Sequence, residues 1–231
     1  MGAVAGGKLG DIYAYRLIKR DELGRVIVDT NGLPQTETGG GNQEQWLLDH
    51  PIGNIQPKVM MSLMPTFNYK GIILSAMLDA KIGGDIVSVS EGIATKAGTS
   101  ERTLYRGEYM TVPGVKADGS PNDILVSAEN YYNRIGLFSN SQGYAEEFVH
   151  DASYIKLKEL SLGYDFPKRM LQKTPLTSLR LSFVARNLCF LMKNAPGNPE
   201  GGYDTTMFSQ ALDFLAVPYA RTYGLTLNLG L

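Results

Sequence analysis

Apolar and polar residues alternate with a period of two over several stretches of this chain. The alternation is most regular at the C-terminus, where the apolar residues are Tyr223, Leu225, Leu227, Leu229 and Leu231. The residues between them are small or polar, and no charge interrupts the run. Strict alternation indicates a β-strand with one apolar and one polar face. Because chain ends fray unless something holds them, we expect this strand to be paired.

The same pattern predicts five more strands, over residues 9–18, 57–70, 71–86, 152–167 and 178–191. These segments are about twice as long as the usual strand of 5–6 residues, or longer. Pro65 lies inside 57–70, where a proline removes a hydrogen bond of the ladder. The pattern therefore predicts an antiparallel, up-and-down meander of about six long strands, an all-β fold.

Short and long connections alternate between these predicted strands. Residues 68–71 and 168–177 make short turns, whereas 19–56, 87–151 and 192–218 make long polar loops. Short turns at one end and long loops at the other are typical of outer-membrane β-barrels. A strand of about twelve residues is about 40 Å long, and at a tilt of ~40° it covers the apolar band of a bilayer. A long-stranded soluble sandwich has the same periodicity, so the loop asymmetry favours the barrel.

Composition narrows the class of protein further. The 231 residues include 22 basic and 23 acidic ones, so no excess of positive charge points to nucleic acid. Cys189 is the single cysteine, which excludes an internal disulfide and a multi-cysteine metal site. The chain contains no run of about 18 apolar residues, so the sequence predicts no membrane-spanning helix. The N-terminus lacks the basic and apolar regions of a signal peptide, so we expect either a cytoplasmic protein or part of a longer one.

In a membrane barrel the two faces of each strand meet different surroundings. We predict a lipid-facing band made of Leu179, Leu181, Phe183, Leu225, Leu227 and Leu229. The charged residues Asp79, Lys81, Arg180 and Arg186 alternate with apolar neighbours, so we predict that they face the lumen. An arginine in mid-membrane would cost ~2–4 kcal/mol. We expect these four residues to solvate the lumen rather than to contact substrate.

One predicted strand changes phase. In 152–166 the apolar residues lie on one side of the alternation at Ile155 and Leu157, and on the other side at Leu160, Leu162, Tyr164 and Phe166. Either a bulge near Lys158 resets the alternation, or the first half of the strand projects above the membrane.

Six segments carry a resemblance to a known family: "GDIYAYR" (10–16), "IGNIQPK" (52–58), "FNYKGIILSAMLDAKIGGDI" (67–86), "DASYIKLKELSLGYDFPKRML" (151–171), "LRLSFVARNLCFL" (179–191) and "YARTYGLTLNLGL" (219–231). With these, the chain resembles the C-terminal part of SusC/RagA TonB-linked outer-membrane transporters of Bacteroidetes. The resemblance implies a 22-stranded barrel with an N-terminal plug. It also implies import of large nutrients, glycans or peptides, across the Gram-negative outer membrane.

The resemblance also implies partners for the chain. These are the remaining barrel strands and the plug, a SusD-like surface lipoprotein, the TonB complex acting through the missing N-terminal part, and outer-membrane lipid. Six strands cannot close a barrel, because the smallest single-chain bacterial barrels have 8. We therefore interpret residues 1–231 as a C-terminal barrel segment whose plug and N-terminal strands are absent, with Met1 an internal start and the C-terminus periplasmic. We expect the segment to be inactive alone.

Other chemistry is weakly indicated. His50 and His150 are the only histidines, and we favour two solvated loop residues over a shared metal. Glu200 and Asp204 suggest at most a loose loop calcium, so we expect no cofactor. Trp46 and the tyrosines of the loop 87–151 either stack on sugars or pack the loops, and we favour packing. No spacing suits a catalytic triad, so we expect no enzyme. The alternative function is a soluble or secreted β-rich carbohydrate-binding module.

Overall fold

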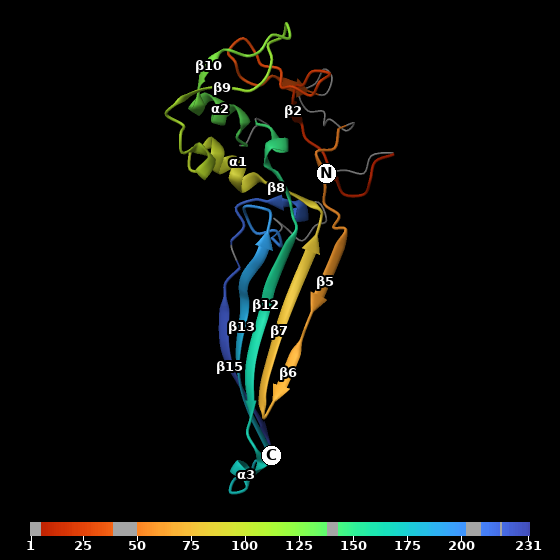
Figure 1. Ribbon diagram of the computed structural model, residues 1–231, viewed down its shortest axis with the longest axis vertical. Helices are drawn as coiled ribbons and strands as arrows, with labels where there is room; N and C mark the ends of the chain where they lie inside the picture. The colour runs from red at the N-terminus through yellow and green to blue at the C-terminus, as the bar shows by residue number, and fades with distance from the viewer. Residues whose placement is uncertain (1–5, 39–49, 138–142, 202–208, 218) are drawn as a thin grey trace. The chain divides into compact units, whose positions relative to one another are not determined.

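The computed structural model describes residues 6–38, 50–137, 143–201, 209–217 and 219–231 (Figure 1). The chain divides into two compact units. We call residues 57–83, 152–194 and 217–231 the strand unit, and residues 1–56, 84–151 and 195–216 the loop unit. Each unit is described by itself.

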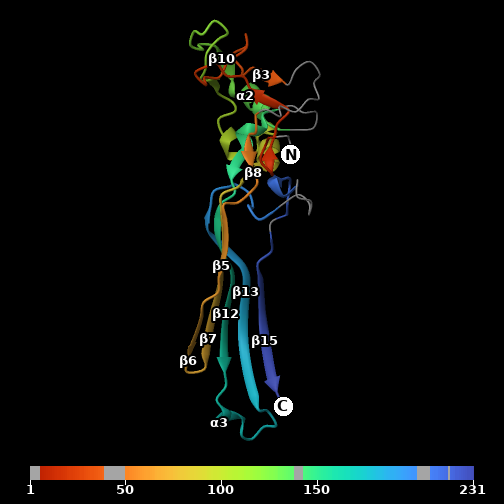
Figure 2. The ribbon, with the colours of Figure 1, turned by 90° about the vertical axis from the view of Figure 1, so that its right-hand side faces the viewer.

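The strand unit is one antiparallel sheet. Its strands are β5 (Val59–Leu63), β6 (Thr66–Tyr69), β7 (Ile72–Ile82), β12 (Tyr154–Asp165), β13 (Ser178–Lys193) and β15 (Thr222–Gly230). They lie in the order β15-β13-β12-β7-β5, and β6 also pairs with β7, so neighbours in space follow one another along the chain. Figure 2 shows the long strands side by side, with the C-terminus at the same end of the sheet as the short helix α3 (Lys168–Leu171). The predicted meander is therefore confirmed.

Pro65 divides one predicted strand in two. β5 and β6 pair with β7 in one unbroken register, with Leu63 opposite Leu78 and Thr66 opposite Ser75. The Pro65 carbonyl still accepts a hydrogen bond from the Ala76 amide, so the proline interrupts the ladder without shifting it. The short turn that follows contains Lys70 and Gly71, both with positive φ, as a tight two-residue hairpin turn requires.

The segment 9–18 was predicted as the first long strand of this sheet, and that placement is wrong. It forms only β1 (Asp11–Ile12) and β2 (Arg16–Ile18), and both belong to the loop unit. Most of its apolar residues are buried, including the adjacent pair Leu17 and Ile18. Because neighbours on opposite sides of the strand are both covered, the segment packs inside a small domain instead of separating two environments.

The loop unit contains short elements. Its remaining strands are β3 (Thr36–Thr38), β4 (Gly53–Asn54), β8 (Asp85–Ser88), β9 (Tyr109–Thr111), β10 (Leu125–Ser127), β11 (Val149–Asp151) and β14 (Leu212–Asp213). Its helices are α1 (Val89–Lys96) and α2 (Ala128–Ile135), with 3-10 turns η1 (Glu101–Thr103), η2 (Ala145–Phe148) and η3 (Ser209–Ala211). No helix among the described residues is long and apolar enough to cross a membrane.

Three small clusters of buried side chains form the interior of the loop unit. One surrounds Ile12 and Val87, a second surrounds Ile18 and Ile135, and a third surrounds Val28. Segments far apart in the sequence meet in each cluster, so the polar stretch 87–151 is not a plain loop. It is part of a folded domain held by long-range contacts.

Candidate functional site

The strand unit has one face that is apolar throughout. The register places Leu179 opposite Leu229, Leu181 opposite Leu227 and Phe183 opposite Leu225, so the two predicted sets lie on the same face. The register through β12, β7, β5 and β6 extends this face across the sheet. Its other members are Val59, Met61, Leu63, Phe67, Tyr69, Ile72, Leu74, Ala76, Leu78, Ala80, Ile82, Ile155, Leu157, Leu160, Leu162, Tyr164, Ala185 and Tyr223.

Many side chains of this apolar face are uncovered. Leu225 is 75% exposed and Leu227 is 57% exposed, and much of the face on β5 to β7 is exposed as well. A soluble domain rarely exposes a contiguous apolar patch of this kind. Something apolar outside the chain therefore has to cover the face.

The opposite face carries the charges of the sheet. Arg180 donates two hydrogen bonds to Asp165, from Nε to Oδ1 at 2.5 Å and from Nη2 to Oδ2 at 2.8 Å. Arg186 Nε donates to Glu159 Oε2 at 2.8 Å. Because each pair joins neighbouring strands, the charges also brace the sheet.

Asp79 is at the centre of a second polar group on this face. Its carboxylate accepts hydrogen bonds from Ser62 Oγ at 2.6 Å and Tyr154 Oη at 3.1 Å. Lys158 Nζ lies 2.8 Å from Asp79 Oδ2. Lys81 follows Asp79 by two residues on β7 and so lies on the same face. The structure thus gathers all four predicted lumen-facing residues on the face opposite the leucines; that this face borders a lumen remains a prediction.

A bulge accounts for the change of phase in β12. The register of β12 against β7 and β13 shifts between Leu157 and Glu159, with Lys158 as the extra residue relative to β7. Ile155 and Leu157 consequently share the apolar face with Leu160. Of the two explanations that the sequence left open, the bulge is the one observed.

Lys156 is a residue that the sequence pattern did not single out. Its side chain is buried, and its Nζ lies 4.9 Å from the Phe190 ring centroid and 5.4 Å from that of Tyr219. Such cation–π contacts compensate part of the cost of burying the charge. Alternation alone signals only that Lys156 is on the polar face, because the aromatic partners come from other segments.

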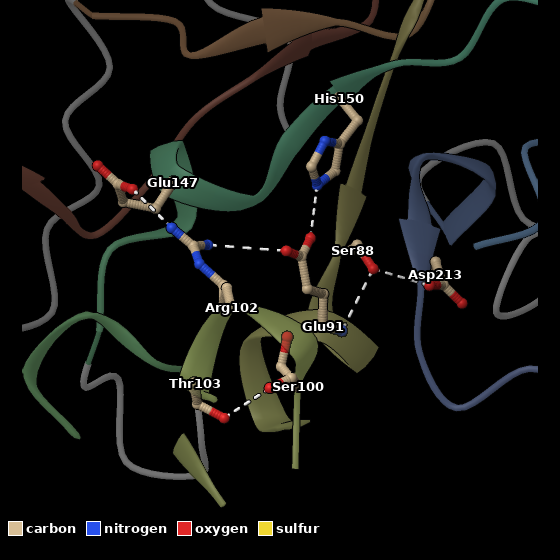
Figure 3. A network of polar contacts seen from close by, with 8 residues as sticks. All are labelled: Ser88, Glu91, Ser100, Arg102, Thr103, Glu147, His150 and Asp213. Carbon is tan, nitrogen blue, oxygen red and sulfur yellow. Dashed lines mark hydrogen bonds and ion pairs between the residues drawn. The ribbon is translucent and has the colours of Figure 1, made fainter. Parts of the chain in front are cut away.

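The loop unit contains a polar network that joins several of its elements (Figure 3). His150 Nε2 lies 2.7 Å from Glu91 Oε2, and Arg102 forms ion pairs with Glu91 and Glu147. The Arg102 guanidinium also lies over the Phe148 ring. The network therefore ties α1, η1, η2 and β11 together.

A second group of hydrogen bonds in the loop unit fixes β14 (Figure 3). Asp213 Oδ2 accepts a hydrogen bond from Ser88 Oγ at 2.9 Å, and Asp213 Oδ1 accepts one from Ser90 Oγ at 3.1 Å. Ser88 is also the N-cap of α1, since its hydroxyl accepts from the Glu91 amide. These contacts hold β14 against the start of α1.

The two histidines have different surroundings. His150 is engaged with Glu91, whereas His50 lines a separate hollow of the loop unit. Within the described ranges, no three His, Cys, Asp or Glu side chains lie close enough together to hold a metal ion. Asp204, half of the suggested calcium pair with Glu200, lies outside the described residues.

The loop tyrosines are mixed in their roles. Tyr144 is buried and donates to the Pro34 carbonyl at 2.8 Å, and Tyr131 contacts Tyr132 edge to face. Tyr105 and Tyr109 are 67% and 74% exposed. Packing thus explains three of the five tyrosines and leaves two on the surface. Trp46 lies outside the described residues.

Two proteins of Formosa agariphila are similar to this chain in sequence. The chain is 25% identical over 195 residues to TonB-dependent receptor P3 of Formosa agariphila, covering 82% of the chain and 18% of that protein. It is 28% identical over 164 residues to TonB-dependent receptor P39 of the same organism, covering 70% of the chain and 15% of that protein. The chain therefore resembles a segment of SusC/RagA-like TonB-dependent receptors. It spans less than a fifth of the length of these curated relatives.

Solved structures are similar to this chain in fold. A structure of the RagAB peptide transporter matches 95% of the chain with a TM-score of 0.57 and 17% identity. The RagAB peptide importer in the "open-open" state matches 96% with a TM-score of 0.55 and 15% identity. In each case the chain covers 22% of the solved chain. At these identities the likeness concerns the fold alone. No family model matches the chain.

Proposed function

We propose that the chain forms part of the wall of an outer-membrane, TonB-dependent importer of large nutrients. The observation that carries this proposal is the apolar face of the sheet, which continues without a charged side chain across β5, β6, β7, β12, β13 and β15. In this proposal the apolar face borders lipid, and the face with Asp79, Lys81, Arg180 and Arg186 borders the lumen. The relatives named as TonB-dependent receptors support the same assignment.

The proposal extends to topology and partners. Residues 1–231 correspond to the C-terminal barrel segment, the chain ends on the periplasmic side, and the loop unit is extracellular. The remaining strands close the barrel around a plug, because the open sheet edges at β5 and β15 would leave backbone groups unpaired in lipid. A SusD-like surface lipoprotein and the TonB complex complete the transporter, and the substrates are glycans or peptides. The RagAB neighbours, described as peptide importers, support this class of substrate.

A soluble carbohydrate-binding module is the less favoured alternative. It would have to cover the apolar face with a second layer, and the described residues of the strand unit form a single sheet without a second layer of its own. The exposed leucines of β15 are therefore better explained by a bilayer.

Labelling from within the bilayer tests the proposal. A hydrophobic photolabel dissolved in the membrane should tag positions 225, 227 and 229 in the whole transporter and spare positions 226 and 228, because alternate residues of β15 face opposite sides. Equal labelling of both sets, or labelling of neither, would refute a lipid-facing wall. For the transport step, the measurement is TonB-dependent uptake by cells that carry or lack the intact transporter.

A further inference from the structure

An open hollow of about 460 Å³ lies beside β2 in the loop unit. Part of its lining is apolar and comes from Leu17, Ile18 and Ile52. Leu17 and Ile18 are buried, and Ile52 packs against the cluster around Ile12, so this part of the lining is fixed by the fold. The volume lies within the range of about 300–1,000 Å³ that is common for small-molecule pockets.

Glu146 places a carboxylate in the lining of this hollow. Its Oε1 accepts a hydrogen bond from the Ile18 amide at 2.5 Å. In the part of the chain that the structure describes, Glu146 has no ion pair. Burial raises the pKa of Glu146, and the Ile18 amide and the charge of Arg20 offset this only in part. A carboxylate in a cavity whose charge is poorly compensated by the protein is a candidate for binding a charged ligand.

The rest of the polar lining indicates the sign of that charge. Glu37, on β3, brings a second carboxylate to the hollow from a different element. Arg20 is the cation of the lining, and its Nη1 points to the Gly24 carbonyl within its own turn. Apart from His50, two carboxylates and one guanidinium leave an excess of one negative charge. The hollow therefore favours a cation over an anion.

The identity of the cation follows from the spacing and the apolar lining. Since no three acidic, histidine or cysteine side chains in the described ranges are close enough to hold a metal, an organic cation fits better than a metal ion. We propose that the hollow binds a primary ammonium group on a short aliphatic stem, with Glu146 as its main partner and Glu37 as a second acceptor. The stem lies against Leu17, Ile18 and Ile52. This site goes beyond the proposed function, because it requires neither transport nor a membrane.

A pair of matched probes tests the site on the full chain. Leucinamide carries an ammonium group and an aliphatic side chain, and N-acetyl-leucinamide keeps the side chain without the charge. By calorimetric titration near neutral pH, we expect leucinamide to bind about tenfold more tightly than its acetylated form, since a charge-assisted hydrogen bond is about twice as strong as a neutral one. Glu146→Gln should weaken leucinamide binding about tenfold and leave the acetylated probe unaffected.

Two further variants keep the test interpretable. The amide oxygen of Glu146→Gln can still accept from the Ile18 amide, and Glu37→Gln alters an exposed side chain, so a folded protein is expected in both cases. Glu37→Gln should weaken leucinamide binding by a smaller factor. Glu101→Gln, at an exposed position of η1 outside the hollow, is the control and should change nothing. Absence of saturable leucinamide binding, equal binding of both probes, or an equal loss in Glu101→Gln would each overturn the proposal.

Discussion

Arginine substitutions along β15 give a graded test of the lipid-facing band. Leu229, Leu227 and Leu225 lie on the apolar face at successive distances from the C-terminal end of the strand. Two residues span about 6.6 Å along a strand, which at a tilt of ~40° is about 5 Å of depth in a bilayer. Each step of two residues should therefore move an introduced arginine substantially deeper into the hydrocarbon.

The expected cost increases with that depth. An arginine on the lipid face costs ~0–1 kcal/mol near the interface and ~2–4 kcal/mol at the midplane. We expect Leu229→Arg to be mild, Leu227→Arg intermediate and Leu225→Arg the most destabilising. Thr226→Arg is the matched control, because Thr226 lies on the polar face opposite Ser182. It should stay within about 0.5 kcal/mol, as is usual for a solvated surface position.

The assay is urea unfolding of the whole transporter carrying this segment in phospholipid vesicles, read as the change in the free energy of unfolding. A soluble sandwich would also lose stability on Leu225→Arg, but it has no reason to show a gradient with depth. Three leucine variants that cost no more than Thr226→Arg would refute the assignment of this face to lipid.

Two further predictions concern the loop unit. Because its folded-state pKa is raised, Glu146 keeps its proton longer in the folded state, so its contribution to stability should be present below its ordinary value of 4.5 and be lost as pH rises through the raised value. Thermal unfolding at about pH 4 to 7 should show this loss in the native chain and not in Glu146→Gln, and an opposite slope would contradict the reasoning. Asp213→Ala removes the acceptor of two serine hydroxyls and should destabilise β14 locally by ~1–3 kcal/mol. The measurement is the rate of amide hydrogen exchange in β14. Asp118→Ala, in an exposed turn, is the control and should leave this rate unchanged. An unchanged rate in Asp213→Ala would contradict the prediction.

The long strands were predictable because one physical demand acts along their whole length. Each of β7, β12, β13 and β15 separates an apolar from a polar face, so the alternation of residue types shows which face most residues occupy; the bulge in β12 is the exception. The pairing of Leu179 with Leu229 follows from the same rule, since a slip by one residue would reverse every side chain. Residues 9–18 carry a similar pattern over a similar length, so the pattern alone could not distinguish a wall strand from two short, buried strands.

The loop unit was not predictable from local pattern. Its tertiary contacts join residues more than a hundred positions apart, as in the bond of the Ile18 amide to Glu146 and that of the Tyr144 hydroxyl to the Pro34 carbonyl. Neither contact leaves a periodic signal in the sequence. The hollow beside β2 depends on the first of these contacts, so its carboxylates could be recognised only once the fold had brought them together.

The bulge in β12 shows how the wall reconciles two demands. Between Glu159 and Leu157 the strand uses one residue more than β7 needs for the same step, and that residue is Lys158. Without the bulge, an unbroken alternation would turn Leu157 to the polar face. With it, Leu157 stays on the apolar face and the ammonium group of Lys158 reaches Asp79. The Asp79 side chain is only 14% exposed, and a carboxylate so far removed from water needs a charged partner. The irregularity thus lets one strand supply a cation to the polar face while its apolar face continues without interruption.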